Sequence, residues 1–70
     1  GPLYDGKNRV NVNLADRETL AAAEYVDSQL AGDIVRVREE RGTFASDEDL
    51  MRVPGIDEYS LPVLKEVLFY

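Results

Sequence analysis

The chain has 70 residues, a net charge of -6, and neither histidine nor cysteine. A chain of this length forms one domain, near the lower size at which a core holds a fold without disulfides, so packed apolar faces must stabilise it. The missing residue types exclude an imidazole base, a thiolate nucleophile and the usual zinc sites, and the acidic balance disfavours nucleic acid as a partner.

The start of the chain carries little pattern. Residues 1–9 are polar with two glycines and are expected to form a flexible lead-in, and Gly1-Pro2 resembles the scar left by a tag-removing protease. Val10 to Leu14 alternate apolar residues with asparagine, which is typical of a short strand. Because no second strand pattern is evident, we expect this segment to lie extended against helices. The domain is predicted to cover residues 10–70.

Two helices are predicted in the first half. Asp16 is a good N-cap for a helix over about residues 17–24, whose alanines raise helix propensity. A longer helix follows to about Arg41, capped by either Asp27 or Ser28, and Gly42 ends it. Its predicted inward stripe consists of Leu30, Ile34, Val35 and Val37.

Two shorter helices are predicted in the second half. Phe44 is expected to plug the core, and Ser46 with Asp49 resembles a capping box that opens a third helix. Pro54 stops that helix, and Gly55 can take a positive φ in the tight turn that follows.

The start of the fourth helix depends on Pro62. Ser60 is preferred to Asp57 as its cap, because Pro62 then lies in the first helical turn, where proline is tolerated. A single turn at Glu58-Tyr59 can precede it. Its apolar face is predicted from Val63, Leu64, Val67, Leu68 and Phe69.

The two halves are similar in sequence. Leu20 to Val35 is matched thirty residues later by Leu50 to Lys65, with Val26-Asp27 matched by Ile56-Asp57. The predicted fold class is therefore all-α, a compact domain of four to five helices. It contains two copies of a helix, a tight turn and a helix.

An ordered set of motifs points to a known family. The motifs are Val10-Asn11-Val12-Asn13-Leu14-Ala15, Ile34-Val35, Arg38-Glu39-Glu40-Arg41-Gly42-Thr43-Phe44, Asp49-Leu50 and Val53-Pro54-Gly55-Ile56. Over about residues 9–69 the chain resembles the tandem helix-hairpin-helix domain of the ComEA type. The resemblance implies two pseudo-symmetric helix-hairpin-helix units.

The resemblance also implies candidate ligands. In nucleic-acid-binding members each hairpin reads glycine, apolar residue, glycine. Backbone N–H groups at the start of its second helix hold a DNA phosphate, because these groups lack intrahelical partners and the helix dipole favours an anion. Related domains serve protein contacts in type II secretion and in a photosystem, and resembled families are often exported or envelope-associated.

This chain departs from the DNA-binding pattern at both hairpins. The second keeps Gly55 but has Asp57 in place of the second glycine, and the first reads Glu24-Tyr25-Val26-Asp27. An aspartate there can accept the N–H bonds itself and adds like charge beside a phosphate. Even if the two aspartates are only helix caps, they block the anion site.

The predicted function is therefore a non-enzymatic module that contacts a protein partner, with weak, sequence-independent binding of duplex DNA as the alternative. No cofactor, metal or small-molecule substrate is expected. Membrane insertion is not expected either, since no apolar stretch approaches the roughly 20 residues that span a bilayer. Carboxylates such as Asp47-Glu48-Asp49 are adjacent in sequence rather than convergent. The predicted partner-binding residues are Tyr25, Val26, Asp27, Gly55, Ile56, Asp57 and Tyr59.

Tyrosines and arginines each leave two interpretations open. Tyr25 and Tyr59 either anchor a partner at the turns or pack against neighbouring helices. Arg38 and Arg41 share a helix face, but the interleaved Glu39-Glu40 favours a solvated face with weak ion pairs. The phosphate contacts expected for the DNA alternative are Arg38, Arg41, Arg52 and Gly55.

Overall fold

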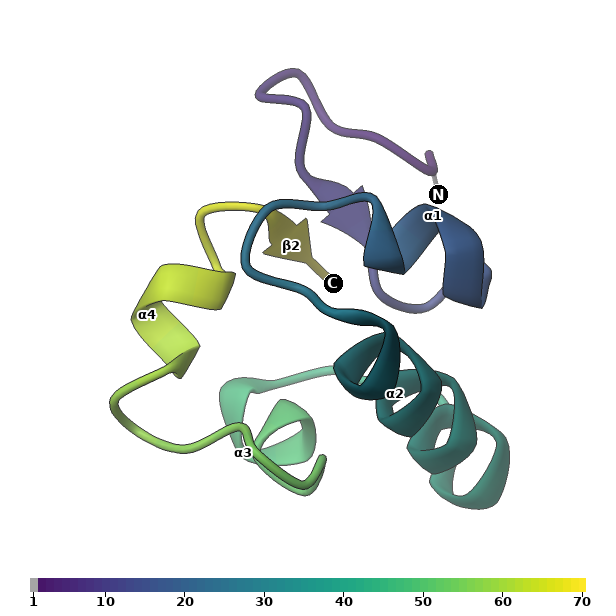
Figure 1. Ribbon diagram of the computed structural model, residues 1–70. Coiled ribbons are helices and arrows are strands. Elements are labelled where there is room, and N and C mark those ends of the chain that lie inside the picture. The colour runs from purple at the N-terminus through teal and green to yellow at the C-terminus, as the bar shows by residue number, and fades with distance from the viewer. Residues whose placement is uncertain (1) are drawn as a thin grey trace.

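The computed structural model describes residues 2–70, so Gly1 of the expected scar lies outside the described residues. Figure 1 shows a long helix, α2, with shorter elements arranged around one end of it. In chain order the elements are β1 (Val10–Asn11), α1 (Arg17–Ala21), α2 (Ser28–Arg41), α3 (Asp47–Leu50), α4 (Leu61–Leu64) and β2 (Leu68–Phe69).

The caps of α1 and α2 follow local sequence. Asp16 accepts the N–H of Thr19 at 2.8 Å, which confirms it as the first N-cap. α1 ends at Ala21, sooner than expected, because the chain turns through residues 22–27 toward α2. Asp27 accepts the N–H of Leu30 at 2.7 Å and is therefore the N-cap of α2. Gly42, with φ of 90°, ends that helix as predicted.

α3 begins as the sequence predicts. Ser46 accepts the N–H of Asp49 at 3.3 Å. The Asp49 carboxylate in turn accepts the N–H of Ala45 at 2.9 Å, so the reciprocal bond reaches one residue further back than in a standard capping box. Both bonds satisfy donors around the start of a helix only four residues long.

Ser60 stands at the N-cap position of α4 as predicted, but its side chain does not cap the helix. Its backbone already has helical angles, φ of -80° and ψ of -26°, and its side chain makes no capping bond to α4. The hydroxyl instead accepts the N–H of Asp57 at 3.0 Å, and Asp57 supplies the carboxylate that caps the turn at residues 58–60. α4 then begins at Leu61, with Pro62 in its first turn as expected.

The expectation that the Val10 segment has no strand partner is wrong. β1 pairs in parallel with β2, with Val10 opposite Leu68 and Asn11 opposite Phe69. Leu68 and Phe69 are therefore strand residues and not part of the last helix. Their run of apolar residues fits a helix face or a short strand equally well, and pairing with a segment almost sixty residues away decides between them. The fold is thus mostly helical with one two-stranded sheet.

The residues before β1 lie against it. Asp5 accepts the N–H groups of Lys7 and Arg9, and its second oxygen pairs with the Arg9 guanidinium at 2.6 Å. Asn11 donates its N–H to the carbonyl of Leu3 at 2.8 Å. In the described part of the chain, no helix is long and apolar enough to cross a membrane.

One core joins all the helices. Leu20 from α1, Ile34 from α2 and Leu50 from α3 are fully buried in it, and Phe44 fills it as predicted. Ala31, rather than the half-buried Leu30, completes the inward face of α2 with Ile34 and Val37. The other buried apolar residues are Val10, Val12, Ala15, Val26, Val53, Ile56, Leu61, Leu64 and Leu68.

Candidate interaction site at the two turns

Two turns of similar backbone course precede the second helix of each half. We call residues 22–27 the first turn and residues 52–57 the second turn. Tyr25 has φ of 69° and Gly55 has φ of 90°, so both adopt the left-handed region. Glycine enters that region freely, whereas a residue with a Cβ is strained there. Tyr25 therefore holds, under strain, the conformation that glycine holds in the second turn.

The residue after each left-handed position points into the core. Val26 is 5% exposed and Ile56 is 4% exposed. Their N–H groups donate to the carbonyls of Ala23 and Val53, at 3.2 and 3.0 Å, which closes each turn. The side chains of Val26 and Ile56 therefore anchor the turns and offer little surface to a partner.

A carboxylate lies at the end of each turn and accepts backbone N–H groups of the following helix or turn. Asp27 Oδ1 accepts from Leu30 at 2.7 Å. Asp57 Oδ1 accepts from Tyr59 and from Ser60, both at 2.9 Å. The bonds from Ser60 and Tyr59 lower the pKa of Asp57 below its usual value, because they favour the charged carboxylate. Each aspartate thus accepts backbone N–H groups at the end of its turn.

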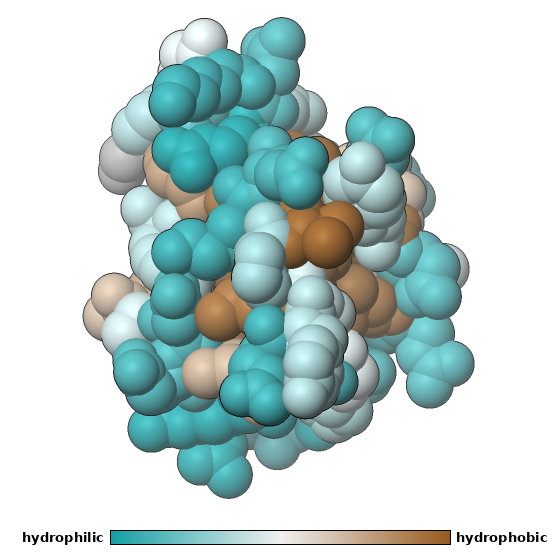
Figure 2. All heavy atoms as spheres, turned by 90° about the vertical axis from the view of Figure 1, so that its left-hand side faces the viewer, coloured by the Kyte–Doolittle hydropathy of each residue, from teal (hydrophilic) through white to brown (hydrophobic). Residues whose placement is uncertain are grey.

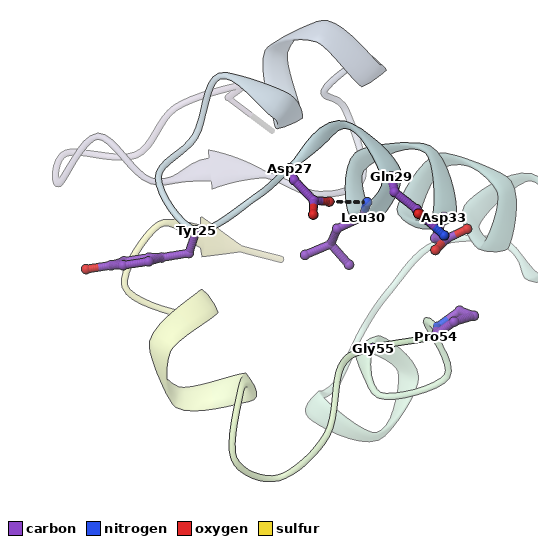
Figure 3. A pocket seen from close by; sticks show the side chains of 7 residues that line it. All are labelled: Tyr25, Asp27, Gln29, Leu30, Asp33, Pro54 and Gly55. Carbon is purple, nitrogen blue, oxygen red and sulfur yellow. Dashed lines mark hydrogen bonds between the residues drawn. The ribbon is translucent and has the colours of Figure 1, made fainter.

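A cleft of about 360 Å³, which we call the inter-turn cleft, lies between the second turn and the start of α2 (Figure 3). The side chain of Leu30 points from α2 toward the second turn, and Pro54 and Gly55 lie across from it. Tyr25 stands at the other side and directs its ring away from Asp27. The cleft is lined by Tyr25, Asp27, Gln29, Leu30, Asp33, Pro54 and Gly55.

The tyrosines near the turns are exposed. Tyr59 is 80% exposed and Tyr25 is 52% exposed, so neither is a core residue. The pKa of the Tyr25 phenol is raised by the nearby charges of Glu24 and Glu66. Val63 of α4 is also partly exposed. Figure 2 shows the α4 side of the molecule, where apolar side chains lie in the middle of a hydrophilic surround.

The candidate phosphate ligands do not form one track. Arg38 donates from Nη1 to the carbonyls of Val12 and Ala15, at 2.8 and 2.7 Å, and so joins α2 to the segment before α1. These bonds give Arg38 a structural role that the sequence did not indicate. Arg41 and Arg52 line one small hollow at the end of α2, and Arg52 pairs with Asp49 at 3.0 Å.

The remaining basic residue of α2 is held by acidic neighbours. Arg36 pairs with Asp33 at 3.2 Å and with Glu40 at 3.1 Å, on the exposed side of the helix. Gly55 lines the inter-turn cleft and not the hollow that Arg41 and Arg52 share. The four residues predicted for the DNA alternative are therefore divided among three places.

Sequence reasoning missed four lining residues of the inter-turn cleft as members of a site: Gln29, Leu30, Asp33 and Pro54. A signal for two of them was present, since Asp27, Leu30 and Asp33 follow at intervals of three and so share a helix face. The opposing wall could not be found in this way, because the second turn reaches the cleft only through the packing of the two halves.

The sequence of the chain matches the helix-hairpin-helix motif family over residues 5–68, and the chain belongs to that family. It is 36% identical over 61 residues to the rat protein "Endonuclease/exonuclease/phosphatase family domain-containing protein 1". That match covers 87% of this chain and 11% of the rat protein, so the chain corresponds to a small part of it. No solved structure matches the chain significantly.

Proposed function

We propose that this domain is a non-enzymatic interaction module whose surface around the two turns contacts a protein partner. The observation that carries the proposal is the occupation of the turn N–H groups by Asp57, with Asp27 placed similarly at the first turn. These are the groups that hold a phosphate in DNA-binding hairpins. The net charge of -6 adds repulsion toward a polyanion. The lack of histidine and cysteine supports the non-enzymatic assignment.

The proposal includes a tandem arrangement of the ComEA type, in which two pseudo-symmetric helix-hairpin-helix units share one core. Features repeated at an interval of thirty residues support it. They are the caps Asp16 and Ser46, the buried Leu20 and Leu50, the left-handed Tyr25 and Gly55, the buried Val26 and Ile56, and the carboxylates Asp27 and Asp57.

The first test is capture of a partner with the 70-residue chain as bait, followed by reconstitution with the purified partner. Tyr25→Ala and Tyr59→Ala should each weaken binding, because these exposed rings stand beside the turns. Glu18→Ala, on the exposed surface of α1, is the control and should leave affinity unchanged. Equal affinity of both tyrosine variants and the parent chain would place the contact elsewhere.

The second test uses fluorescent duplex DNA and anisotropy at several salt concentrations. The proposal expects no saturable binding at physiological salt up to about 100 µM, the weak end of the usual range for non-specific binders. Micromolar binding that falls steeply with added salt would overturn the protein-partner proposal.

Duplex DNA is the second candidate ligand because the second turn keeps one feature of a phosphate-binding hairpin. Gly55 is left-handed, and a Cβ there would meet no heavy atom within 4 Å, so a ligand can approach its backbone. The name of the rat relative includes the words endonuclease and exonuclease. If DNA is the ligand, Asp57→Gly should strengthen binding by freeing the N–H groups of Tyr59 and Ser60.

Two variants control that experiment. Asp16→Gly removes the same charge and the same kind of cap at α1, away from the turns, so it separates release of N–H groups from a change in net charge. Arg52→Ala should weaken DNA binding, because Arg52 is the basic residue that begins the second turn. A response to neither Asp57→Gly nor Arg52→Ala would show that DNA, if bound, lies elsewhere.

A further inference from the structure

We infer that the inter-turn cleft binds a basic side chain of the protein partner, an arginine or lysine that stands beside an apolar residue. This inference rests on the proposed protein-binding function. It adds the chemistry that the partner must present and the residues that recognise it.

The shape of the cleft suits a side chain. Its volume of about 360 Å³ is near the lower end of the roughly 300–1,000 Å³ found for ligand sites, which fits one or two side chains and not a large ligand. Leu30 projects into it and Pro54 forms part of the far wall, so apolar atoms are available for the stem of a long side chain. Gly55 keeps one wall open because it lacks a Cβ.

The charges of the cleft select a cation. Two of the lining residues are carboxylates, Asp27 and Asp33, and none is an arginine or lysine. Asp27 uses Oδ1 to cap α2, which leaves Oδ2 available to a ligand. Asp33 uses Oδ1 to pair with Arg36, which also pairs with Glu40. One arginine is therefore shared between two acids, and the negative charge of the cleft is only partly offset.

The spacing on α2 defines the pattern of the ligand. Asp27, Leu30 and Asp33 follow at intervals of three at the start of α2, and all three line the cleft, so a carboxylate, an apolar side chain and a carboxylate stand in order along its wall. The two carboxylates are about 9 Å apart along the helix axis at 1.5 Å per residue. A segment with a basic residue beside an apolar one complements this order, with the apolar residue against Leu30 and Pro54.

A second copy of this chain is a poor source of that basic group. In the part of the chain that the structure describes, Arg9, Arg36, Arg52 and Lys65 are in ion pairs. Arg17 and Arg38 donate to backbone carbonyls. Each copy also carries a net charge of -6, which opposes self-association. Lys7 and Arg41 are exposed and lie outside these pairs, so it is mainly the repulsion between two acidic copies that favours a different protein as the source of the complementary charge.

Amide chemical shifts of the ¹⁵N-labelled 70-residue chain test the inference directly. The probe is a set of ten-residue peptides with one arginine flanked by leucine, isoleucine or phenylalanine, and a matched set with citrulline in place of arginine. Citrulline keeps the shape and removes the charge. The arginine set should shift Gln29, Leu30, Asp33 and Gly55, and the citrulline set should shift them at least about threefold less at equal concentration, the loss of one partly exposed ion pair.

Isosteric variants provide the second arm. The double substitution Asp27→Asn, Asp33→Asn should weaken peptide affinity about three- to tenfold, the range that two partly exposed ion pairs supply. Asparagine is as good an N-cap as aspartate, so the fold should persist, and unchanged dispersion of the amide spectrum checks this. Glu18→Gln removes an exposed carboxylate of α1 that does not line the cleft, and it should leave the affinity unchanged.

Two results would overturn the inference: equal shifts from the arginine and citrulline sets, or shifts confined to residues outside the cleft. An absence of shifts with every peptide would also overturn it. If partner capture still succeeds in those cases, the proposed protein-binding function stands and only the cleft assignment fails. Salt-sensitive micromolar binding to duplex DNA would instead remove the proposed function itself.

Discussion

The two turns follow the same backbone course with different residues. Both place a left-handed residue before a buried apolar one and a carboxylate after it. The first turn reads Glu24-Tyr25-Val26-Asp27 and the second reads Pro54-Gly55-Ile56-Asp57. The comparison shows which features the turn requires. The buried apolar residue and the left-handed angle are common to both, whereas the glycine that makes that angle easy is present in only one.

The helices that follow the two turns differ as well. α2 has 14 residues and α4 has 4. Pro62 lacks the N–H that would donate to the carbonyl of Glu58, so the second helix cannot run regularly from the second turn. The chain leaves α4 after Leu64 and continues to β2, which pairs with β1. Four predictions test how far the two turns are equivalent, in order of expected effect.

The largest effect is expected from the apolar anchors of the turns. Ile56→Ala should lower the free energy of unfolding by about 2–5 kcal/mol, the usual cost of removing a buried isoleucine side chain. Val26→Ala should cost less, because fewer buried carbon atoms are lost. Urea unfolding followed by circular dichroism measures both, and Val63→Ala on the exposed part of α4 is the control. A larger cost for Val26→Ala would show that the first turn is the more important anchor.

The second prediction concerns the bond that fastens α2 to the segment before α1. Arg38→Met should lower the free energy of unfolding by about 2–3 kcal/mol, because two carbonyls lose a charged donor. Arg41→Met, on an exposed residue of the same helix, should change it by less than about 0.5 kcal/mol. Equal effects of the two substitutions in urea unfolding would contradict the structural assignment of Arg38.

The third prediction compares the two left-handed positions. Gly55→Ala should cost about 1–2 kcal/mol from backbone strain alone, since a Cβ there meets no neighbouring atom. Tyr25→Gly should change stability less, because relief of strain opposes the lost contacts of the ring and the added freedom of the unfolded chain. Thermal unfolding of the two variants checks this. If Tyr25→Gly is the more destabilising, packing of the ring outweighs strain at the first turn.

The smallest effect is expected from Asp57 of the second turn, on the way that the stability of the domain depends on pH. The folded-state pKa of Asp57 is lowered from 3.8 by its bonds with Ser60 and Tyr59. A lowered pKa means that its stabilising contribution is present above pH 3.8 and is lost as the pH falls through the folded-state value. Asp57→Asn should therefore flatten the acid side of the curve of stability against pH. An acid limb equal to that of the parent chain would show that these bonds do not favour the charged form.

The helix caps illustrate what could be predicted locally. Asp16, Ser46 and Gly42 act as the sequence indicates, because capping depends on bonds within three or four residues. Ser60 is the exception. It holds the N-cap position of α4, but its hydroxyl accepts the N–H of Asp57, while the Asp57 carboxylate accepts the N–H groups of Tyr59 and Ser60. Competition between two adjacent candidates depends on geometry that spacing alone does not reveal.

The candidate site was predicted in part. The structure decides between the two interpretations of the tyrosines, since Tyr59 is exposed and Tyr25 half-exposed, and both aspartates cap. Arg38 could not be assigned from periodicity, because its bonds reach carbonyls more than twenty residues away. The lining of the inter-turn cleft likewise combines residues of the two halves, and no local pattern brings Leu30 to face Gly55.

By itself, the sequence determined a small, acidic, cysteine-free helical domain of similar halves, with its main caps and the apolar residues that anchor its turns. Those properties follow from composition and from interactions over a few residues. Only the tertiary structure decided that β1 pairs with β2, that Tyr25 adopts a glycine-like angle, and that the two turns enclose a cleft. Each of these depends on contacts between segments far apart in the chain, whose free energy is set by packing and not by local preference.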